Sequence, residues 1–405
     1  MPKKTIRDLD VTGKRVFIRA DFNVPMDDHG HITDDRRVRL TVPTILSVLD
    51  RGGSVVVASH LGRPDGTGFQ ASESARPVRD LLDRLLAGHI DGPVKMAGDV
   101  PTCAESAAAA AALKPRQVLL LENLRFEKGE KKGDPTFAAK LAAYADAYVN
   151  DAFGCSHRTD ASMDALPRAM APKPCVAGLL LDRELTYLQG VLEHPKRPFV
   201  AIIGGAKVSD KIAALTNLCG RVDTIVVGGA MAYTFLLAQG IGVGRSLVQP
   251  DMVEKARTIL GFAKERGTAL LLPTDHVCGA ELKAGTTTSV VVGAIPDGLM
   301  GLDIGPATLA AYSAAVRCAK TIVWNGPMGA FETEPFNAGT FGLAKAVAQA
   351  TTNGCTSVAG GGDTASAVDQ AGLADALTHI STGGGASLEM LEGKPFACLA
   401  ALQDA

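Results

Sequence analysis

The sequence predicts an α/β protein built from two doubly wound, Rossmann-like parallel-sheet domains that are joined by a central helix and a hinge. Three observations lead to this fold class. Short apolar runs rich in β-branched residues alternate with stretches of helical composition, the pattern of a parallel sheet covered by helices on both faces. The length of 405 residues exceeds the size at which one hydrophobic core stops growing. The composition, 46% hydrophobic and 21% charged, is that of a globular chain.

The charge and the cysteine content narrow the classes of function. A formal net charge of -2 gives no overall attraction to nucleic acid or acidic membranes, so any anion site must be local. The eight cysteines form no Cys-x-x-Cys pair and no zinc-type cluster with histidine, so we expect reduced, mostly buried thiols. The first residues carry charges where a signal peptide needs an apolar core, and no apolar run is long enough to span a bilayer. We therefore expect a cytoplasmic protein that binds neither nucleic acid nor membranes.

Strands are predicted in the first half at residues 16–20, 54–58, 118–121 and 145–150. Because open parallel sheets bind ligands beyond the carboxyl ends of their strands, the residues after each run matter most. Asp21 and Asn23 follow the first run with alternate spacing and could offer an acceptor and an amide to a hydroxyl. Basic residues near strand ends or in adjoining loops are Arg37, His60, Arg63, Arg125 and Arg158. One such residue is usually a solvated surface charge, but five from separate segments predict a site for a small polyanion.

A connecting helix is predicted in the middle of the chain. Leu181, Leu185, Leu188 and Leu192 recur at helical spacing, and the segment ends in a basic, proline-containing stretch at 193–198. The leucines alone would fit any amphipathic helix. We interpret the segment as a connecting helix followed by the domain boundary.

Glycine turns follow the predicted strands of the second half. Residues 199–203 lead into Gly204-Gly205-Ala206-Lys207, and we expect this turn to open a helix with Lys207 and Lys211 on one face. Further strands at 224–227, 269–273 and 321–324 precede Gly228-Gly229-Ala230, Thr274 and Asn325. Neither the Walker pattern Gly-x-x-x-x-Gly-Lys-Ser/Thr nor Gly-x-Gly-x-x-Gly after a strand occurs here, which disfavours ordinary P-loop NTPases and simple dinucleotide enzymes.

A phosphate site is predicted at residues 357–368, where an apolar run reaches three glycines, then Asp363-Thr364, then small helix-forming residues. Glycines let a phosphate approach the backbone, and the free N–H groups of a helix start favour an anion. Asp363 stands where a nucleotide-bound Mg²⁺ would sit, since Mg²⁺ takes one or two protein oxygens plus phosphates and waters. A second glycine triplet, at 383–385, also precedes a helical run. Because turn glycines are common, this prediction depends on the surrounding motifs.

Several motifs together closely resemble the phosphoglycerate kinase family, in the family's order and over nearly the whole chain. They are Arg19-Ala20-Asp21-Phe22-Asn23-Val24-Pro25, Ser59-His60-Leu61-Gly62-Arg63-Pro64, Leu121-Glu122-Asn123-Leu124-Arg125-Phe126, Gly204-Gly205-Ala206-Lys207-Val208-Ser209-Asp210-Lys211, Trp324-Asn325-Gly326-Pro327, Gly360-Gly361-Gly362-Asp363-Thr364 and Ser381-Thr382-Gly383-Gly384-Gly385-Ala386-Ser387. The resemblance implies reversible transfer of the acyl phosphate of 1,3-bisphosphoglycerate to Mg-ADP, giving 3-phosphoglycerate and ATP. Mg²⁺ is then the cofactor and ATP/ADP the co-substrate.

The resemblance also implies a domain organisation. Residues 1–180 would form the 3-phosphoglycerate domain, 181–198 the interdomain helix and linker, and 199–388 the nucleotide-binding domain, while 389–405 would pack back onto the first domain. We expect a monomer that binds these small molecules and closes about its hinge, because substrates held on different domains must be brought together away from water.

By motif match, the resemblance assigns roles to individual residues. The substrate would contact Asp21, Asn23, Arg37, His60, Leu61, Gly62, Arg63, Arg125 and Arg158, with His60 and the last three arginines anchoring the phosphate that stays behind. The group in transit would meet Arg37, Lys207, Lys211, Gly383, Gly384 and Gly385, and Arg36 is the rival of Arg37. The nucleotide would contact Lys211, Gly228, Gly229, Gly301, Asn325, Glu332, Gly361, Gly362, Asp363 and Thr364. Among these, Asp363 would hold the metal, Glu332 the ribose, and Gly301 with Gly228-Gly229 would line the adenine slot.

Two positions depart from the family pattern. Ala230 stands where relatives often have a third glycine, and Asp160 follows Arg158 where a neutral residue or a histidine is common. Either would weaken binding, and neither removes a catalytic group. A nucleotide-linked oxidoreductase and a catalytically dead nucleotide sensor remain as alternatives on the same fold. The missing dinucleotide motif disfavours the first, and the retained lysines, arginines and Asp363 disfavour the second.

Overall fold

A computed structural model describes residues 2–405 and divides the chain into two compact units. Unit 1 comprises the residues up to Leu185 together with Pro395–Ala405, and unit 2 comprises Thr186–Lys394. The chain passes from one unit to the other within helix α7 (Leu179–Glu193), the segment predicted as a connecting helix. The C-terminal segment that belongs to unit 1 starts at Pro395, after the expected residue 389. Within residues 2–405, no helix combines the length and apolarity needed to cross a membrane.

Unit 1 is built on a five-stranded parallel sheet of order β3-β2-β1-β4-β5. Its strands are β1 (Arg15–Ala20), β2 (Ser54–Ala58), β3 (Val118–Leu120), β4 (Ala147–Asp151) and β5 (Cys175–Ala177). They are almost entirely buried, as expected for a parallel sheet that is covered on both faces. The order of connection reverses between β1 and β4, so the carboxyl ends of these two strands flank the place where open α/β sheets bind ligands.

Helices cover both faces of this sheet. They are α1 (Arg36–Leu49), α2 (Arg76–Leu85), α3 (Ala104–Ala111), α4 (Lys128–Lys131), α5 (Pro135–Ala142), α6 (Ala165–Ala169) and α15 (Ala397–Ala400), with short 3₁₀ turns η1 (Ile6–Asp8), η2 (Ala71–Glu73), η3 (Leu124–Phe126) and η4 (Phe153–Cys155). Side chains along β1 alternate between the two faces of the sheet. Val16 and Ile18 belong to the core that includes α1 and α2, whereas Phe17, on the other face, stacks on Tyr148 with 6.1 Å between the ring centroids.

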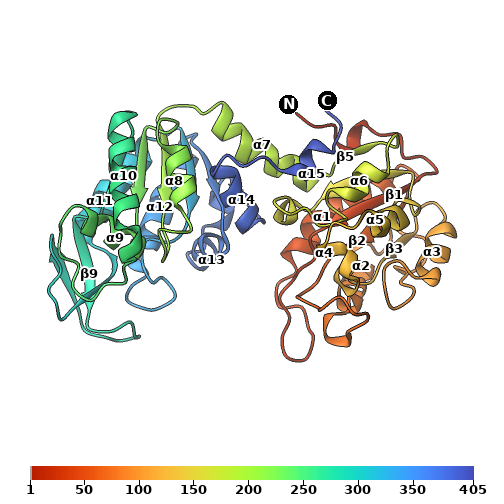
Figure 1. Ribbon diagram of the computed structural model, residues 1–405, viewed down its shortest axis with the longest axis horizontal. Helices are drawn as coiled ribbons and strands as arrows, with labels where there is room; N and C mark the ends of the chain where they lie inside the picture. The colour runs from red at the N-terminus through yellow and green to blue at the C-terminus, as the bar shows by residue number, and fades with distance from the viewer. Residues whose placement is uncertain (1) are drawn as a thin grey trace. The chain divides into compact units, whose positions relative to one another are not determined.

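The two ends of the chain meet in unit 1 (Figure 1). The Lys4 N–H donates to the Gln403 carbonyl at 2.9 Å, and the Lys3 ammonium pairs with the Asp404 carboxylate at 2.7 Å. The thiol of Cys398, on α15, donates to the carbonyl of Ser156 at 3.2 Å. Unit 1 is therefore completed by the last residues of the chain.

Unit 2 is built on a six-stranded parallel sheet of order β14-β13-β12-β6-β7-β8, whose connection order reverses between β12 and β6. Its strands are β6 (Phe199–Ile203), β7 (Thr224–Val227), β8 (Ala269–Leu271), β12 (Thr321–Asn325), β13 (Thr356–Ala359) and β14 (His379–Ile380). Its helices and 3₁₀ turns are α8 (Ile212–Leu218), α9 (Met231–Ala238), η5 (Pro250–Met252), α10 (Val253–Glu265), α11 (Pro306–Cys318), α12 (Ala338–Thr352), α13 (Gly362–Gln370), η6 (Ala374–Ala376) and α14 (Gly384–Leu391). The predicted fold class, two units each built on a parallel sheet, is confirmed.

A small antiparallel sheet in unit 2 lies outside the prediction. Its strands are β9 (Asp275–Gly279), β10 (Thr288–Val292) and β11 (Met300–Ile304), in the order β10-β9-β11. It shares a separate core with α9, in which Tyr233 and Leu236 pack against Cys278 and Ile295. The eight cysteines are free thiols and most are buried, as predicted.

Candidate active site

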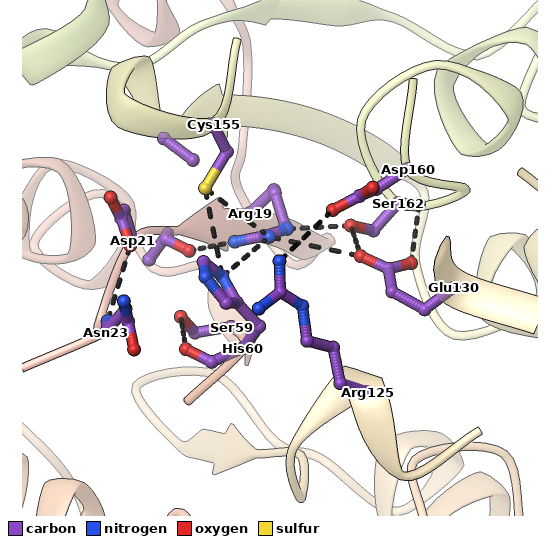
Figure 2. A network of polar contacts seen from close by, with 12 residues as sticks. Arg19, Asp21, Asn23, Ser59, His60, Arg125, Glu130, Cys155, Asp160 and Ser162 are labelled. Atoms are coloured by element: carbon purple, nitrogen blue, oxygen red, sulfur yellow. Dashed lines mark hydrogen bonds and ion pairs between the residues drawn. The ribbon is translucent and has the colours of Figure 1, made fainter. Parts of the chain in front are cut away.

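A buried arginine stands at the centre of the anion site of unit 1 (Figure 2). Arg19, on β1, is 0% exposed, and its Nε donates to the Ser162 hydroxyl at 2.7 Å. Because that oxygen accepts from Arg19, its own proton goes to Oε1 of Glu130, at 2.6 Å, while the Ser162 N–H donates to Oε2 at 2.9 Å. The guanidinium and the Glu130 carboxylate are 3.9 Å apart and both are fully buried. Arg19, Ser162 and Glu130 thus form a hydrogen-bonded ion pair beneath the site.

His60 is held by this ion pair in one protonation state. Nη2 of Arg19 lies 3.4 Å from Nδ1 of His60, and since arginine only donates, Nδ1 must accept and the ring proton is on Nε2. Burial, followed by the charges of Arg19, Arg125, Arg158 and Arg37, lowers the pKa of His60 well below its usual value. His60 is therefore a neutral ring whose proton is on Nε2.

Arg37 is placed against the two residues that follow β1. Its Nη1 donates to Oδ2 of Asp21 at 2.9 Å and to the carbonyl of Asn23 at 3.2 Å. The side-chain oxygen of Asn23 accepts from the Gly62 N–H at 2.8 Å, which joins the loops after β1 and β2. Gly62 has a φ of +57°, a left-handed backbone conformation that favours glycine. These contacts place Arg37 beside Asp21, whereas the rival Arg36 is exposed at the start of α1.

Arg125 and Arg158 leave guanidinium hydrogens without acceptors. Arg125 is 8% exposed, and its Nη1 donates to the Gly62 carbonyl at 2.8 Å. Its Nε, like Nη1 of Arg158, is buried and has no hydrogen-bond partner among residues 2–405. Burial, followed by the charge of Arg158, lowers the pKa of Arg125. Since buried donors are normally satisfied, this arrangement fits a small bound anion.

Two other predicted substrate residues have different surroundings. Arg63 is exposed. Leu61 is held through its backbone, because its N–H donates to the side-chain oxygen of Asn123 at 3.2 Å and its carbonyl accepts from the Asn123 amide at 2.7 Å. The Asn123 side chain thus fixes the loop that presents His60 and Gly62.

The same cluster contains a geometric candidate for a metal. Ligand atoms of Asp21, His60 and Cys155 all lie within 4.8 Å of one another. However, Nδ1 of His60 accepts from Arg19 and the carboxylate of Asp21 accepts from Arg37, so both groups are already engaged by arginines. Because Arg19 and Arg37 contact these groups directly, the cluster fits an anion and not a cation.

Glycine turns meet at the carboxyl ends of β6, β7 and β12 in unit 2. A Cβ on Gly204 would lie 2.0 Å from the Pro327 carbonyl oxygen, and a Cβ on Gly326 would lie 2.1 Å from that of Gly204. A Cβ on Gly229 would lie 2.5 Å from the Gly205 carbonyl oxygen, and one on Gly228 would lie 2.4 Å from a methionine sulfur. The turns approach so closely that only glycine can be accommodated.

The starts of α13 and α14 converge beside these turns. Gly361, with a φ of +100°, caps α13, and Gly383 caps α14. A Cβ on Gly384 would lie 3.4 Å from Cα of Gly361, so the two helix starts are neighbours. The amide nitrogen of Asn325 is buried, lies 3.4 Å from the Cβ position of Gly361, and has no hydrogen-bond partner in the described part of the chain. Two helix N-termini and a buried amide donor fit a phosphate group.

The predicted helical face with Lys207 and Lys211 is wrong. Helix α8 begins at Ile212, so both lysines lie in the turn before it. The Ser209 N–H donates to the side-chain oxygen of Gln249 at 3.0 Å and so does not form a helical hydrogen bond. Lys207 is exposed, whereas the ammonium of Lys211 donates to the Asn325 side-chain oxygen. Burial lowers the pKa of Lys211 against the opposing charges of nearby carboxylates, Asp363 among them.

Asp363 and Thr364 open α13 with opposite orientations. Asp363 is exposed in the first turn, whereas Thr364 is fully buried and its hydroxyl accepts from the Gly326 N–H at 2.7 Å. Gly362, between the cap residue Gly361 and Asp363, is also exposed. One exposed carboxylate beside a phosphate-binding backbone fits the requirements of Mg²⁺ bound to nucleotide phosphates. Thr364 fixes the turn after β12.

The residues predicted for the base and the ribose lie farther along unit 2. Gly301 is on β11, its N–H donates to the Ser246 hydroxyl at 2.9 Å, and a Cβ there would lie 2.2 Å from the Tyr233 hydroxyl. Tyr233 belongs to α9, which starts just after the Gly228-Gly229 turn with Ala230 as its cap. Glu332 is exposed in the turn that follows β12. Gly301 is thus tied to the glycine turns through α9.

Sequence reasoning missed Arg19, Glu130 and Ser162 as site residues. An arginine inside the apolar run at 16–20 is the available signal, because a buried guanidinium requires a partner. The partners are more than a hundred residues away, and nothing local marks them.

Unit 1 presents a cluster of arginines with hydrogen-bond donors that have no partner among residues 2–405, and unit 2 presents helix N-termini lined by glycine. These two sites together indicate a phosphotransferase. Comparison with known proteins then identifies its family. The sequence model described as phosphoglycerate kinase matches residues 6–394. The phosphoglycerate kinases of Chloroflexus aurantiacus and Rhodopirellula baltica are each 52% identical to this chain, with 100% of both chains covered. The chain belongs to the phosphoglycerate kinase family.

Solved structures agree with this assignment. The structure of phosphoglycerate kinase from Coxiella burnetii has a TM-score of 0.90 and 39% identity, covering 99% of this chain and 98% of that one. The enzyme from Pyrococcus horikoshii has a TM-score of 0.79 and 29% identity, with 99% and 98% covered. The chain is therefore a kinase with a carboxyl acceptor, which interconverts 1,3-bisphosphoglycerate plus ADP and 3-phosphoglycerate plus ATP in glycolysis. The predicted family and activity are confirmed, and neither alternative is supported.

Proposed function

We propose that the two substrates are held by different units of this enzyme. The arginine cluster of unit 1 binds 3-phosphoglycerate, with Arg125, Arg158 and the Nε2–H of His60 on its phosphate. The glycine turns and helix starts of unit 2 bind the nucleotide. The observation that supports this division most strongly is the pair of buried donors without acceptors, Nε of Arg125 and Nη1 of Arg158, since no partner among residues 2–405 satisfies them.

The chemistry requires no protein base. In the ATP-forming direction the leaving group is a carboxylate, which is ionised at neutral pH because carboxyl groups titrate at about 4. The site must instead align the reactants and place positive charge around the equatorial oxygens of the moving group. We assign that role to Lys211, Arg37 and the N–H groups of residues 383–385. Lys207, which is exposed, contributes charge from the same turn.

Asp363 is proposed as the protein ligand of Mg²⁺. The metal would neutralise charge on the nucleotide phosphates during transfer. The neighbouring helix start at Gly361 and Gly362 then contacts the phosphates, and Asn325 keeps Lys211 in position through their hydrogen bond. Glu332 is proposed for the ribose, and Gly301 with the Gly228-Gly229 turn for the adenine.

Substrates on separate units must be brought together, so we propose that the units close about the region of α7 and exclude water. X-ray scattering with both substrates should show a smaller radius of gyration than the free enzyme, and an unchanged radius would contradict closure. We also propose a monomeric, cytoplasmic enzyme that binds no nucleic acid. The free cysteines support a reducing compartment, and a wheat relative, 48% identical, is named as cytosolic.

The division between units is tested by two substitutions. Arg158→Met should raise KM for 3-phosphoglycerate with little effect on KM for ATP, because it removes a ligand from unit 1 only. Asp363→Asn should instead weaken Mg-ATP binding with little effect on 3-phosphoglycerate. Arg168→Met is the matched control, since Arg168 is an exposed arginine of α6 paired with Asp164 at 2.8 Å. Equal effects of Arg158→Met on both substrates would contradict the proposal.

A further inference from the structure

An acidic residue lies inside the arginine cluster of unit 1. Asp160 follows η4 and is only 8% exposed. Its carbonyl accepts from the N–H groups of Met163 at 2.9 Å and Asp164 at 3.1 Å, which fix its backbone. Figure 2 shows its carboxylate facing the guanidinium of Arg125, with Oδ2 and Nη2 3.9 Å apart. Asp160 is therefore held beside a proposed phosphate ligand by the fold itself.

Three acids pair with arginines in this cluster, and the pair at Asp160 is the weakest by geometry. Asp21 accepts from Arg37 at 2.9 Å, and Glu130 is linked to Arg19 through the Ser162 hydroxyl. Oδ2 of Asp160 has no hydrogen-bond partner among the described residues, and Nε of Arg125 has none either. The pair compensates charge, but it does not satisfy the donors of Arg125. A phosphate can therefore accept from Nε of Arg125 without breaking a hydrogen bond.

We propose that Asp160 is an internal counter-charge that holds Arg125 in place before the substrate binds and sets the affinity for the substrate phosphate. This inference rests on the proposed role of Arg125 as a phosphate ligand. When the phosphate binds, Arg125 exchanges a long ion pair for charge-assisted hydrogen bonds, which are shorter and stronger. Asp160 remains nearby as a like charge and opposes the bound phosphate. It is a positioning residue, since it acts through Arg125 and takes no part in the transfer.

The test is the substitution Asp160→Asn, which keeps the shape of the side chain and removes its charge. We expect the dissociation constants of 3-phosphoglycerate and of inorganic phosphate to fall by about tenfold at low salt. Most of the gain should persist as salt is added, because Asp160 and Arg125 are buried and salt screens buried charges much less than exposed ones. KM for ATP should not change, and Asp160→Glu should bind phosphate as weakly as the parent enzyme. A loss of stability does not produce this pattern.

Asp164→Asn is the matched control, because it makes the same charge change four residues along, at a carboxylate paired with exposed Arg168. Unchanged or weaker phosphate binding in a folded Asp160→Asn enzyme overturns the inference. Arg125→Gln separates this failure from failure of the proposed site. If Arg125→Gln weakens phosphate binding and Asp160→Asn does not strengthen it, only the counter-charge role is wrong. If Arg125→Gln also has no effect, the proposed phosphate site itself is wrong.

Discussion

The buried ion pair beneath the anion site leads to a quantitative prediction for Glu130→Gln. Both oxygens of Glu130 accept hydrogen bonds from Ser162, and the carboxylate is 3.9 Å from the fully buried guanidinium of Arg19. Burial raises the pKa of Glu130, while Arg19 and Ser162 oppose the shift and favour the carboxylate. Glutamine keeps the volume and one acceptor but leaves Arg19 buried without its counter-charge. Removing one partner of a buried pair costs about 3–5 kcal/mol of unfolding free energy.

The chain offers a way to locate this loss. Trp324 is the single tryptophan and lies in unit 2, so its fluorescence reports unit 2, while circular dichroism reports both units. For Glu130→Gln we expect an early transition by circular dichroism, with the melting temperature of unit 1 lowered by roughly 6–12 °C for a loss of about 3 kcal/mol. The fluorescence transition should stay in place. Asp164→Asn, which breaks an exposed pair, should lower stability by no more than about 1 kcal/mol.

A loss below about 1 kcal/mol for Glu130→Gln would refute the reasoning, because an uncompensated buried guanidinium cannot be that well tolerated. A fluorescence transition that shifts as far as the circular dichroism transition would also refute it, since the perturbed contacts all lie in unit 1.

Three further predictions concern single residues. Lys211→Ala should lower kcat by roughly a hundredfold or more with little change in melting temperature, as expected for loss of one transition-state donor, and near-normal steady-state turnover would contradict its role. Burial raises the pKa of Asp151 to about 7, well above the unfolded value of about 4, so its protonated form stabilises the fold fully below pH 4 and this contribution is lost as the pH rises through 7. Asp151→Asn keeps the acceptor for the Leu180 and Leu181 N–H groups but does not titrate. Its free energy of unfolding, from urea denaturation followed by circular dichroism, should depend less on pH between 4 and 7 and should be higher than that of the parent at pH 8. An unchanged dependence on pH would contradict this prediction. The ring of His60 should show the Nε2–H tautomer in ¹⁵N NMR and should stay neutral as the pH falls through its ordinary pKa of about 6.5, because burial and the arginines lower its pKa. A titration midpoint near that ordinary value would contradict burial among arginines.

Much of the fold could be predicted because the strands are buried on both faces. The apolar run at 54–58 coincides with β2, and the run at 199–203 coincides with β6. The antiparallel sheet could not be predicted in this way. Its edge strand β10 exposes Val290 and Val292, so its residues do not show the buried pattern of the other strands. Strand β14 has only the two residues His379 and Ile380, too few for any pattern.

The candidate site could be predicted where a residue follows a strand directly. Asp21, His60 and Asn325 were found by that rule, and the structure places them at the carboxyl ends of their strands. The positions of Lys207 and Lys211 were predicted wrongly, because α8 begins only at Ile212. In the turn before it, Ser209 donates to Gln249, a residue from a distant segment that the local sequence does not reveal. Glu130 and Ser162 were missed because their contacts with Arg19 also join segments that are distant in the sequence. Their importance arises from burial next to Arg19, and burial of a charge depends on tertiary contacts.

The most direct test of the account is a crystal structure of the enzyme with 3-phosphoglycerate and a non-reactive Mg-nucleotide. We predict the phosphate of 3-phosphoglycerate within hydrogen-bond distance of Arg125 and Arg158, and the nucleotide phosphates at the starts of α13 and α14 with Mg²⁺ on Asp363. Both ligands bound to the same unit, or a 3-phosphoglycerate phosphate that contacts neither arginine, would contradict it.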